Sequence, residues 1–384
     1  MGTVLLALLW FAVDEPDSTA QTDVPALVSR LSDPDPNLRA ASAGRLGKLG
    51  NKAQGAIPAL LEALKDTVPT DCGPLVCQAA STALADIGEA ALPALTAALE
   101  NSDRRVYIGA ASAIHDMGPR AKAAVPKLIS LLEKQEPERR LAMIAGLQGI
   151  GPEACSAVPL LIQLLDSDDF HTQYWACRAL GAIGPAAKPA VPVLCRLTKA
   201  GLPSVRRNAA AALGKIGPEI GPEGLQTLIA ALGDRFEPVR ENAVIALGDL
   251  GGFAAPAVPV IRTALAQRKI AARVASARTW WKATGDPAAA LPTLIEQLTT
   301  PEEAEAAAAV LGEIGPPAKA AVPALIEQLK SPDQEPKVMV CQTLARIGPA
   351  SQPALATLRT LLQDEDPELR QAAEESIRQI TPKP

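Results

Sequence analysis

Side chains capable of metal or nucleophilic chemistry are few in this sequence, and they are widely spaced. The chain has two histidines, His115 and His171, and six cysteines. No two cysteines have the Cys-x-x-Cys spacing that is typical of a thiolate zinc site. A histidine-based metal site would need ligands from distant parts of the fold. The sequence therefore predicts no catalytic residue, no metal site and no bound cofactor.

Three of the cysteines fall at positions that are apolar elsewhere in a recurring pattern. Cys177 and Cys341 take the place of small residues, and Cys195 takes the place of isoleucine. Cysteine in such a position behaves as a small hydrophobic residue, so these three are expected in the core. Cys72 and Cys77 lie close in sequence. They either form a disulfide in an oxidising compartment or remain two unpaired thiols.

The composition predicts short helices. Hydrophobic residues make up 48% of the 384 residues, but aromatic residues only 3%. Ala, Leu, Ile and Val must therefore fill the core, and Ala and Leu are strong helix formers. The 35 prolines exclude long uninterrupted helices, because proline is tolerated at the first turn of a helix but not in its interior. Many short helices that begin or end at Pro and Gly are typical of repeat proteins.

The charge and the apolar runs argue against two classes of partner. The chain has 37 Lys and Arg against 42 Asp and Glu, a net charge of −5. A nucleic-acid-binding protein usually carries a basic excess, so nucleic acid is not an expected partner. No apolar run reaches the roughly 20 residues that a transmembrane helix needs. The chain is therefore expected to have no transmembrane span.

A repeat of about 33 residues organises the chain into eleven copies. Its anchor is an apolar residue followed by proline and a run such as AVPALIEQL. Gln226 and Ala356 replace the proline in two copies. The anchoring prolines are Pro25, Pro58, Pro93, Pro126, Pro159, Pro192, Pro259, Pro292 and Pro323.

Each copy is expected to form two helices. The first helix begins at the proline, whose missing N–H costs nothing in the first turn. A short turn follows, in which Asp and Ser can bind free backbone N–H groups. The second helix has the pattern V-R-x-x-A-x-x-A-L-G-x-I-G-P, with a stripe of small and apolar residues at spacings of three and four. Glycine ends this helix and the proline after it prevents its continuation, as at Gly217-Pro218.

These features resemble HEAT repeats of the short bacterial type, often called phycobilin-lyase HEAT-like repeats. The resemblance covers residues 24–384, and it rests on the period, the turn and the Val-Arg pair. It implies an all-α fold, a right-handed α-solenoid of about eleven two-helix repeats, with the second helices on the concave face. One HEAT-like enzyme family, the deoxyhypusine hydroxylases, holds iron through His-Glu pairs, and this sequence has no His-Glu pair.

The domain prediction is one array, residues 24–384, preceded by a segment of different character, residues 1–23. In that segment a ten-residue apolar run, Val4–Val13, precedes the small residues Ser18-Thr19-Ala20. It is either a signal peptide, which implies export, or a helix that caps the first repeat of a cytoplasmic protein. Signal peptides normally carry Lys or Arg before the apolar run, and none is present. At the other end, Glu374 and Arg378 make the last helix polar, as suits a terminal cap.

A basic residue recurs at the start of the second helix. A ligand-binding interpretation makes this column a ladder for phosphates or carboxylates. The structural interpretation, which we favour, has each side chain bind turn carbonyls or a turn carboxylate such as Asp234 in an adjacent repeat. The column consists of Arg39, Arg140, Arg206, Arg240, Arg273, Lys337 and Arg370.

The predicted concave face offers one cluster of unusual composition. In copy five, Tyr174, Trp175 and Arg178 fall one, two and five positions after the column, where side chains point away from the core. Copy six adds Arg207 and Asn208 at equivalent positions. Aromatic and guanidinium groups are common in interface hot spots, so these five residues are the candidate partner-binding site. The alternative is that the aromatic rings pack under a neighbouring turn.

The sequence therefore favours a non-enzymatic scaffold that binds a protein or peptide on its concave face. A HEAT-like enzyme or chromophore-lyase-related factor is the second hypothesis, and it would need a cluster of nucleophile, acid and base. A HEAT-like nucleic-acid binder is the third, and the acidic charge opposes it.

Overall fold

The computed structural model describes residues 23–71, 73–134, 137–199, 201–266, 273–331 and 336–381. These residues form helices and turns, and none of them belongs to a β-strand. The all-α prediction is therefore confirmed. The N-terminal run at residues 4–13 and Cys72 lie outside the described residues, so the leader and the disulfide stay predictions.

Packing divides the chain into two units, Met1–Leu194 and Cys195–Pro384, and the division falls within helix α11 (Val191–Leu197). Each unit is described by itself. The helices of the first unit are α1 (Val24–Arg30), α2 (Pro36–Lys48), α3 (Ile57–Ala63), α4 (Val76–Ile87), α5 (Leu92–Ala98), α6 (Arg104–Met117), α7 (Val125–Glu133), α8 (Pro137–Ile150), α9 (Val158–Leu164) and α10 (Phe170–Ile183).

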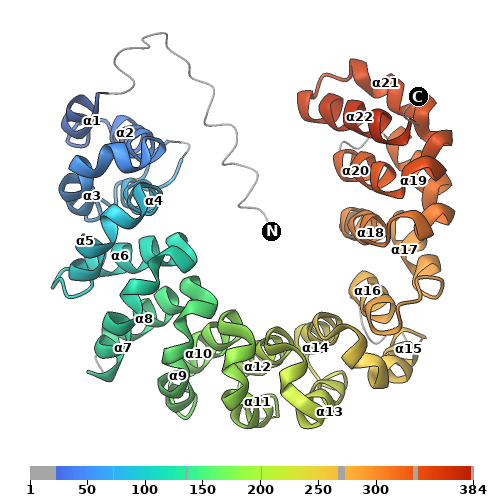
Figure 1. Ribbon diagram of the computed structural model, residues 1–384, viewed down its shortest axis with the longest axis horizontal. Helices are drawn as coiled ribbons and strands as arrows, with labels where there is room; N and C mark the ends of the chain where they lie inside the picture. Colours follow the sequence, from blue (N-terminus) through green and yellow to red (C-terminus); the bar gives the residue numbers. More distant parts are fainter. Residues whose placement is uncertain are drawn as a thin grey trace. The chain divides into compact units, whose positions relative to one another are not determined.

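The second unit continues the same alternation of a short odd-numbered and a longer even-numbered helix. Each odd helix and the even helix after it form one of the predicted two-helix repeats (Figure 1). Its helices are α12 (Pro203–Ile216), α13 (Gly221–Ala231), α14 (Glu237–Asp249), α15 (Val258–Ala266), α16 (Arg273–Thr284), α17 (Leu291–Gln297), α18 (Pro301–Ile314), α19 (Val322–Lys330), α20 (Lys337–Ile347), α21 (Leu355–Thr360) and α22 (Pro367–Ile380).

Short 3₁₀ helices connect most repeats, and the sequence reasoning missed them. Glycine does end the even helix as predicted: Gly184 has φ +73°, a left-handed conformation that costs glycine little. The chain then continues as a 3₁₀ helix instead of stopping at the proline. These elements are η3 (Gly50–Ala56), η4 (Gly88–Ala91), η5 (Gly118–Ala124), η6 (Gly151–Ala157), η7 (Gly184–Ala190), η8 (Gly217–Ile220), η9 (Gly251–Ala257), η10 (Pro316–Ala321) and η11 (Gly348–Ala354), and η12 (Leu361–Gln363) follows α21.

The even helices form one layer in each unit because small residues let successive members approach closely. Helix α2 packs on α4, and α12 on α14. Figure 1 shows the even-numbered helices along the inner side of the curve within each unit. At Gly214 a Cβ atom would lie 2.5 Å from the Cα of Ala246, and at Gly47 it would lie 2.9 Å from the Cα of Ala83. Real Cβ atoms do not approach backbone so closely, so glycine sets these helix separations.

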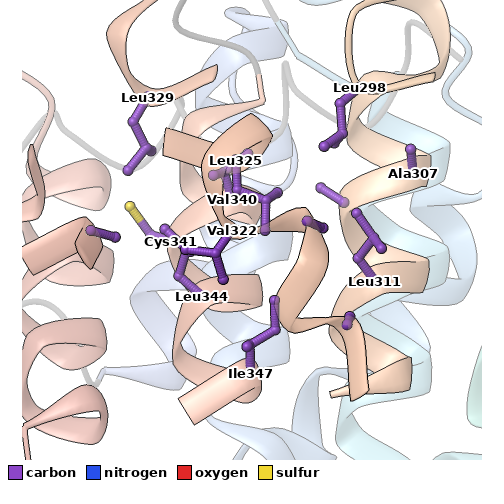
Figure 2. Packing of buried hydrophobic residues seen from close by; sticks show 14 of the residues in the cluster. Leu298, Ala307, Leu311, Val322, Leu325, Leu329, Val340, Cys341, Leu344 and Ile347 are labelled. Carbon is purple, nitrogen blue, oxygen red and sulfur yellow. The ribbon is translucent and has the colours of Figure 1, made fainter. Parts of the chain in front are cut away.

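The core is continuous from repeat to repeat within a unit. Leu311 of α18, Leu325 of α19 and Leu344 of α20 are fully buried in one cluster, and Figure 2 shows their side chains between the same three helices. Burying a leucine contributes roughly 1.5–3 kcal/mol. Cys341 lies in this cluster, and Cys177 and Cys195 are also buried, as predicted.

The last helix closes the second unit with a polar side. In α22, Leu369, Ala373 and Ile380 are buried, whereas Glu374 and Arg378 are exposed. A helix with one buried and one polar side of this kind is typical of a capping repeat.

One helical run among the described residues, Arg139–Leu164, is long and apolar enough by composition to cross a membrane. Half of its most apolar stretch is buried in the protein. The run contains the end of α8, η6 and α9, with Gly151 at φ +67° between them. Core helices of soluble proteins satisfy the same criterion, so this is weak evidence for a span.

Replacing Gly214 with Ala is expected to lower the free energy of unfolding by about 1–3 kcal/mol, because the added methyl group must push α12 away from α14. Gly44→Ala is the matched control. Gly44 also lies inside an even helix, but nothing lies within 4 Å of an added Cβ. That change is expected to be neutral or to stabilise the protein by up to about 1 kcal/mol. Urea denaturation of both variants measures the difference, and equal effects would contradict the role of glycine in helix spacing.

Candidate partner-binding site

Helix α10 presents the predicted aromatic cluster. The helix begins at Asp169, whose carboxylate accepts hydrogen bonds from the backbone N–H groups of His171 (3.1 Å) and Thr172 (3.2 Å). The Thr172 hydroxyl donates a third hydrogen bond to it (2.6 Å) and is the main cause of the lowered pKa of Asp169. Ala176, Cys177 and Leu180 form the buried stripe of the helix. The cap and the stripe together fix which side of α10 faces solvent.

Tyr174, Trp175 and Arg178 lie together on the other side of α10. The Arg178 Nη1 donates a hydrogen bond to the Tyr174 Oη at 3.0 Å. Its Cζ lies 5.0 Å from the Trp175 ring centroid and 5.7 Å from that of Tyr174. The two rings meet edge to face, with centroids 5.5 Å apart. The prediction that Tyr174 and Arg178 share a face is therefore confirmed.

The cluster is partly open to solvent. Tyr174 and Trp175 are half-buried, and Arg178 is exposed. Among the described residues, no carboxylate forms an ion pair with Arg178. Its guanidinium is instead held over two rings, an arrangement worth roughly 0.5–1 kcal/mol at an exposed site. The surface thus combines ordered aromatic area with a positive charge that a partner can pair.

Arg207 and Asn208 lie on α12 in the second unit, so their surface is described separately from the cluster on α10. Both are half-buried. The Asn208 amide donates to the backbone oxygen of Ser204 at 2.7 Å. Part of its hydrogen-bonding capacity is therefore used within its own helix. That the five residues bind one partner stays a prediction.

Members of the basic column bind other groups of the protein itself. The Arg206 Nε and Nη2 donate to the two carboxylate oxygens of Asp234 at 2.7 and 3.0 Å, and its Nη1 donates to the Gly201 oxygen at 2.8 Å. The exposed fractions of the two charged side chains are only 7% and 12%. The Arg206 guanidinium holds the pKa of Asp234 below its usual range.

Other members of the column repeat this role. Arg39 pairs with Asp66 at 2.6 Å and donates to the Asp33 oxygen at 2.8 Å. Arg240 donates to the Asp234 oxygen at 2.9 Å, and Arg370 donates to the Asp364 oxygen at 2.7 Å. The structural interpretation is therefore confirmed for Arg206 and these three residues. Their guanidinium groups donate hydrogen bonds to turns, so these residues do not form a row of unpaired cations for a ligand.

The histidines are not brought together. His115 is half-buried, and its Nδ1 lies 2.9 Å from the Ala145 oxygen. His171 is exposed beside Phe170, with ring centroids 4.0 Å apart. Within the described part of the chain, no three His, Cys, Asp or Glu side chains are close enough to hold a metal ion.

Two exposed apolar residues were missed by the sequence reasoning. Leu202 and Phe236 immediately precede α12 and α14, and their side chains are 46% and 39% exposed. Aspartate caps the equivalent helix end in other repeats, as at Asp169. A large apolar residue in place of that aspartate in two successive copies is a signal that the sequence does contain.

Comparison with known proteins gives one family. A family model for HEAT repeats matches residues 5–73, 125–201, 191–279 and 291–378. No curated protein matches the sequence.

Many solved structures share local similarity. An engineered protein is 25% identical, covering 93% of this chain and 98% of its own, with a TM-score of 0.38. The CpcE–CpcF complex of phycocyanin lyase from Nostoc sp. PCC7120 is 24% identical, covering 66% and 97%, with a TM-score of 0.38. A structure from work on cadherin and β-catenin is 15% identical, covering 94% of each chain, with a TM-score of 0.39. At these TM-scores the likenesses carry no argument about function.

Replacing Asp234 with Asn is expected to cost about 3 kcal/mol of stability at pH 7, because it leaves the buried Arg206 charge without its carboxylate. The pKa of Asp234 is lowered in the folded protein. Its contribution is therefore complete above the ordinary carboxyl range and is lost as the pH falls through the lowered pKa. The difference between wild type and variant should shrink in strong acid. Denaturation at pH 7 and at lower pH measures it.

Asp249→Asn is the control for that experiment. Asp249 pairs with Lys215 at 3.0 Å, but the lysine side chain is 62% exposed. Such a pair contributes at most about 1 kcal/mol. Equal losses in the two variants at pH 7 would show that the Arg206–Asp234 pair has no special structural role.

Proposed function

Because the chain belongs to the HEAT-repeat family, we propose that it is a non-enzymatic scaffold that binds a partner protein or peptide on the layer of its even-numbered helices. Stacked repeats of this kind present extended surfaces suited to such partners. The observation that carries the proposal is the ordered cluster of Tyr174, Trp175 and Arg178 on α10.

The chemistry of the cluster indicates the partner. Trp and Tyr supply large contact area with little loss of side-chain freedom, and Arg supplies charge and planar hydrogen bonds. The Arg178 side chain is already positioned by Tyr174, so binding orders it little further. A segment carrying a carboxylate for Arg178 and an apolar side chain for Trp175 fits this surface. Arg207 and Asn208 are proposed as further contacts on α12.

Catalysis is the less favoured alternative, as a HEAT-like enzyme or chromophore-lyase-related factor. It would need an activated nucleophile beside an acid or base. Burial raises the pKa of the Cys177 and Cys341 thiols to about 12. Both are therefore protonated at neutral pH and poor nucleophiles. The net charge of −5 likewise supports a protein partner over nucleic acid.

Replacing Trp175 with Ala is expected to weaken binding of a captured and purified partner by about 1 kcal/mol or more, roughly fivefold or more in Kd. The change should cost only about 1 kcal/mol of stability, since the ring is half-buried and its ring contacts are Tyr174 and Arg178. Isothermal titration with the purified partner gives the first quantity, and urea denaturation gives the second.

Ile108→Ala is the matched control, because Ile108 is a 40% exposed apolar residue on α6, one position after the column as Tyr174 is. It should bind the partner like wild type. A stability loss of about 3–5 kcal/mol in Trp175→Ala with unchanged Kd would mean that the ring is a packing residue, and would reject the proposed site.

A further inference from the structure

The turns that begin α12 and α14 expose large apolar residues, whereas α18 and α20, which also lack a side-chain cap, begin at Thr300 and Pro336. Four other even helices begin at an aspartate whose carboxylate accepts a backbone N–H: α2, α6, α10 and α22. Helix α12 begins at Leu202 and α14 at Phe236, and neither has a side-chain cap. Leu75 is also apolar at the start of α4, but there the Gln78 side chain binds the free Leu75 N–H. Leu202 and Phe236 therefore forgo a stabilising cap and expose apolar side chains instead.

Two guanidinium groups contact the Phe236 ring. Arg206 lies 5.3 Å and Arg235 lies 5.0 Å from its centroid. Arg206 is fixed by Asp234, and the same carboxylate accepts the Phe236 backbone N–H at 2.8 Å. The exposed ring thus has a defined place, which lowers the ordering cost when a ligand packs on it.

A surface cavity of about 520 Å³, wholly in the second unit, is lined in part by Arg206 and Arg235, the two residues that contact this ring. Its charged lining consists of Lys199, Arg206, Asp234 and Arg235. The Asp234 charge is matched by Arg206. Lys199 and Arg235 are exposed, and no carboxylate in the described part of the chain forms an ion pair with either. The cavity therefore has two positive charges available to a ligand, on a protein that is acidic as a whole.

We propose that this edge of repeats six and seven is a docking site for an acidic peptide segment that also carries an apolar side chain. A carboxylate of the segment pairs with Lys199 and Arg235 at the cavity, and its apolar side chain packs on Phe236 and Leu202. The two positive charges favour an acidic segment, and the exposed apolar residues favour an apolar side chain beside its carboxylate. The site is independent of the cluster on α10.

A peptide suits the site better than a nucleic acid. A phosphate backbone needs a row of cations along its length, whereas the cavity offers two and also contains the Asp234 carboxylate. A peptide carboxylate needs only the two, and the Asp234 carboxylate is already paired with Arg206.

The probe is a fluorescein-labelled 12-residue peptide of Glu, Phe and Leu, measured by fluorescence anisotropy on the full chain at low salt. Saturable binding is expected, and it should weaken as salt is added. The Lys199→Glu, Arg235→Glu variant should bind about tenfold more weakly or worse, since two attractions become repulsions. Phe236→Ser should bind several-fold more weakly. A peptide with Lys in place of Glu should not bind wild type.

Two controls test whether the peptide binds at this cavity. Lys319→Glu, Arg346→Glu makes the same change in net charge at exposed residues elsewhere in the second unit, and it should bind like wild type. The variants are also measured in an Arg178→Glu background, which removes any binding of the acidic peptide at the cluster on α10, so failure of that cluster and failure of this site give different results. The proposal is overturned if the acidic peptide does not bind, or if both double variants bind equally. It is also overturned if an oligothymidine binds more tightly than the peptide at the same residues.

Discussion

The close approach of successive even-numbered helices is the constraint on which the rest of the structure depends. Gly214 against Ala246 and Gly47 against Ala83 leave no room for a further carbon atom. Because the backbones meet there, large side chains lie at other positions, as Leu311 of α18 and Leu344 of α20 do, which pack in one cluster with Leu325 of the odd helix α19. The same packing recurs in both units and supports the Arg–Asp pairs of the turns, which join one repeat to the next.

In a protein built in this way, the polar residues that recur from repeat to repeat are used for contacts within the fold. Arginines of the column such as Arg206 bind turns, and buried thiols such as Cys177 have raised pKa values. The proposed interaction sites therefore lie where a repeat departs from its neighbours. Tyr174 and Trp175 place two aromatic rings on α10, and Phe236 stands before α14 where four other even helices have a capping aspartate. Each departure exposes aromatic surface beside an arginine.

The sequence predicts the repeats well because their signals are local and repeated. The proline at the start of most odd helices, the aspartate caps and the glycine ends all act within one or two turns of helix. The 3₁₀ helices were missed, since proline after Gly184 also fits a simple stop. The exposure of Leu202 and Phe236 was missed. It depends on whether neighbouring side chains cover the turn, and residue type alone does not show this.

The central claim is that a partner contacts the even-numbered layer at the cluster on α10. Photo-crosslinking tests it most directly, with a photoreactive side chain installed either at position 175 or at position 62, an exposed position on the odd helix α3. The account predicts that the partner crosslinks from position 175 and not from position 62. Crosslinking from position 62 alone, or equally from both positions, would contradict it.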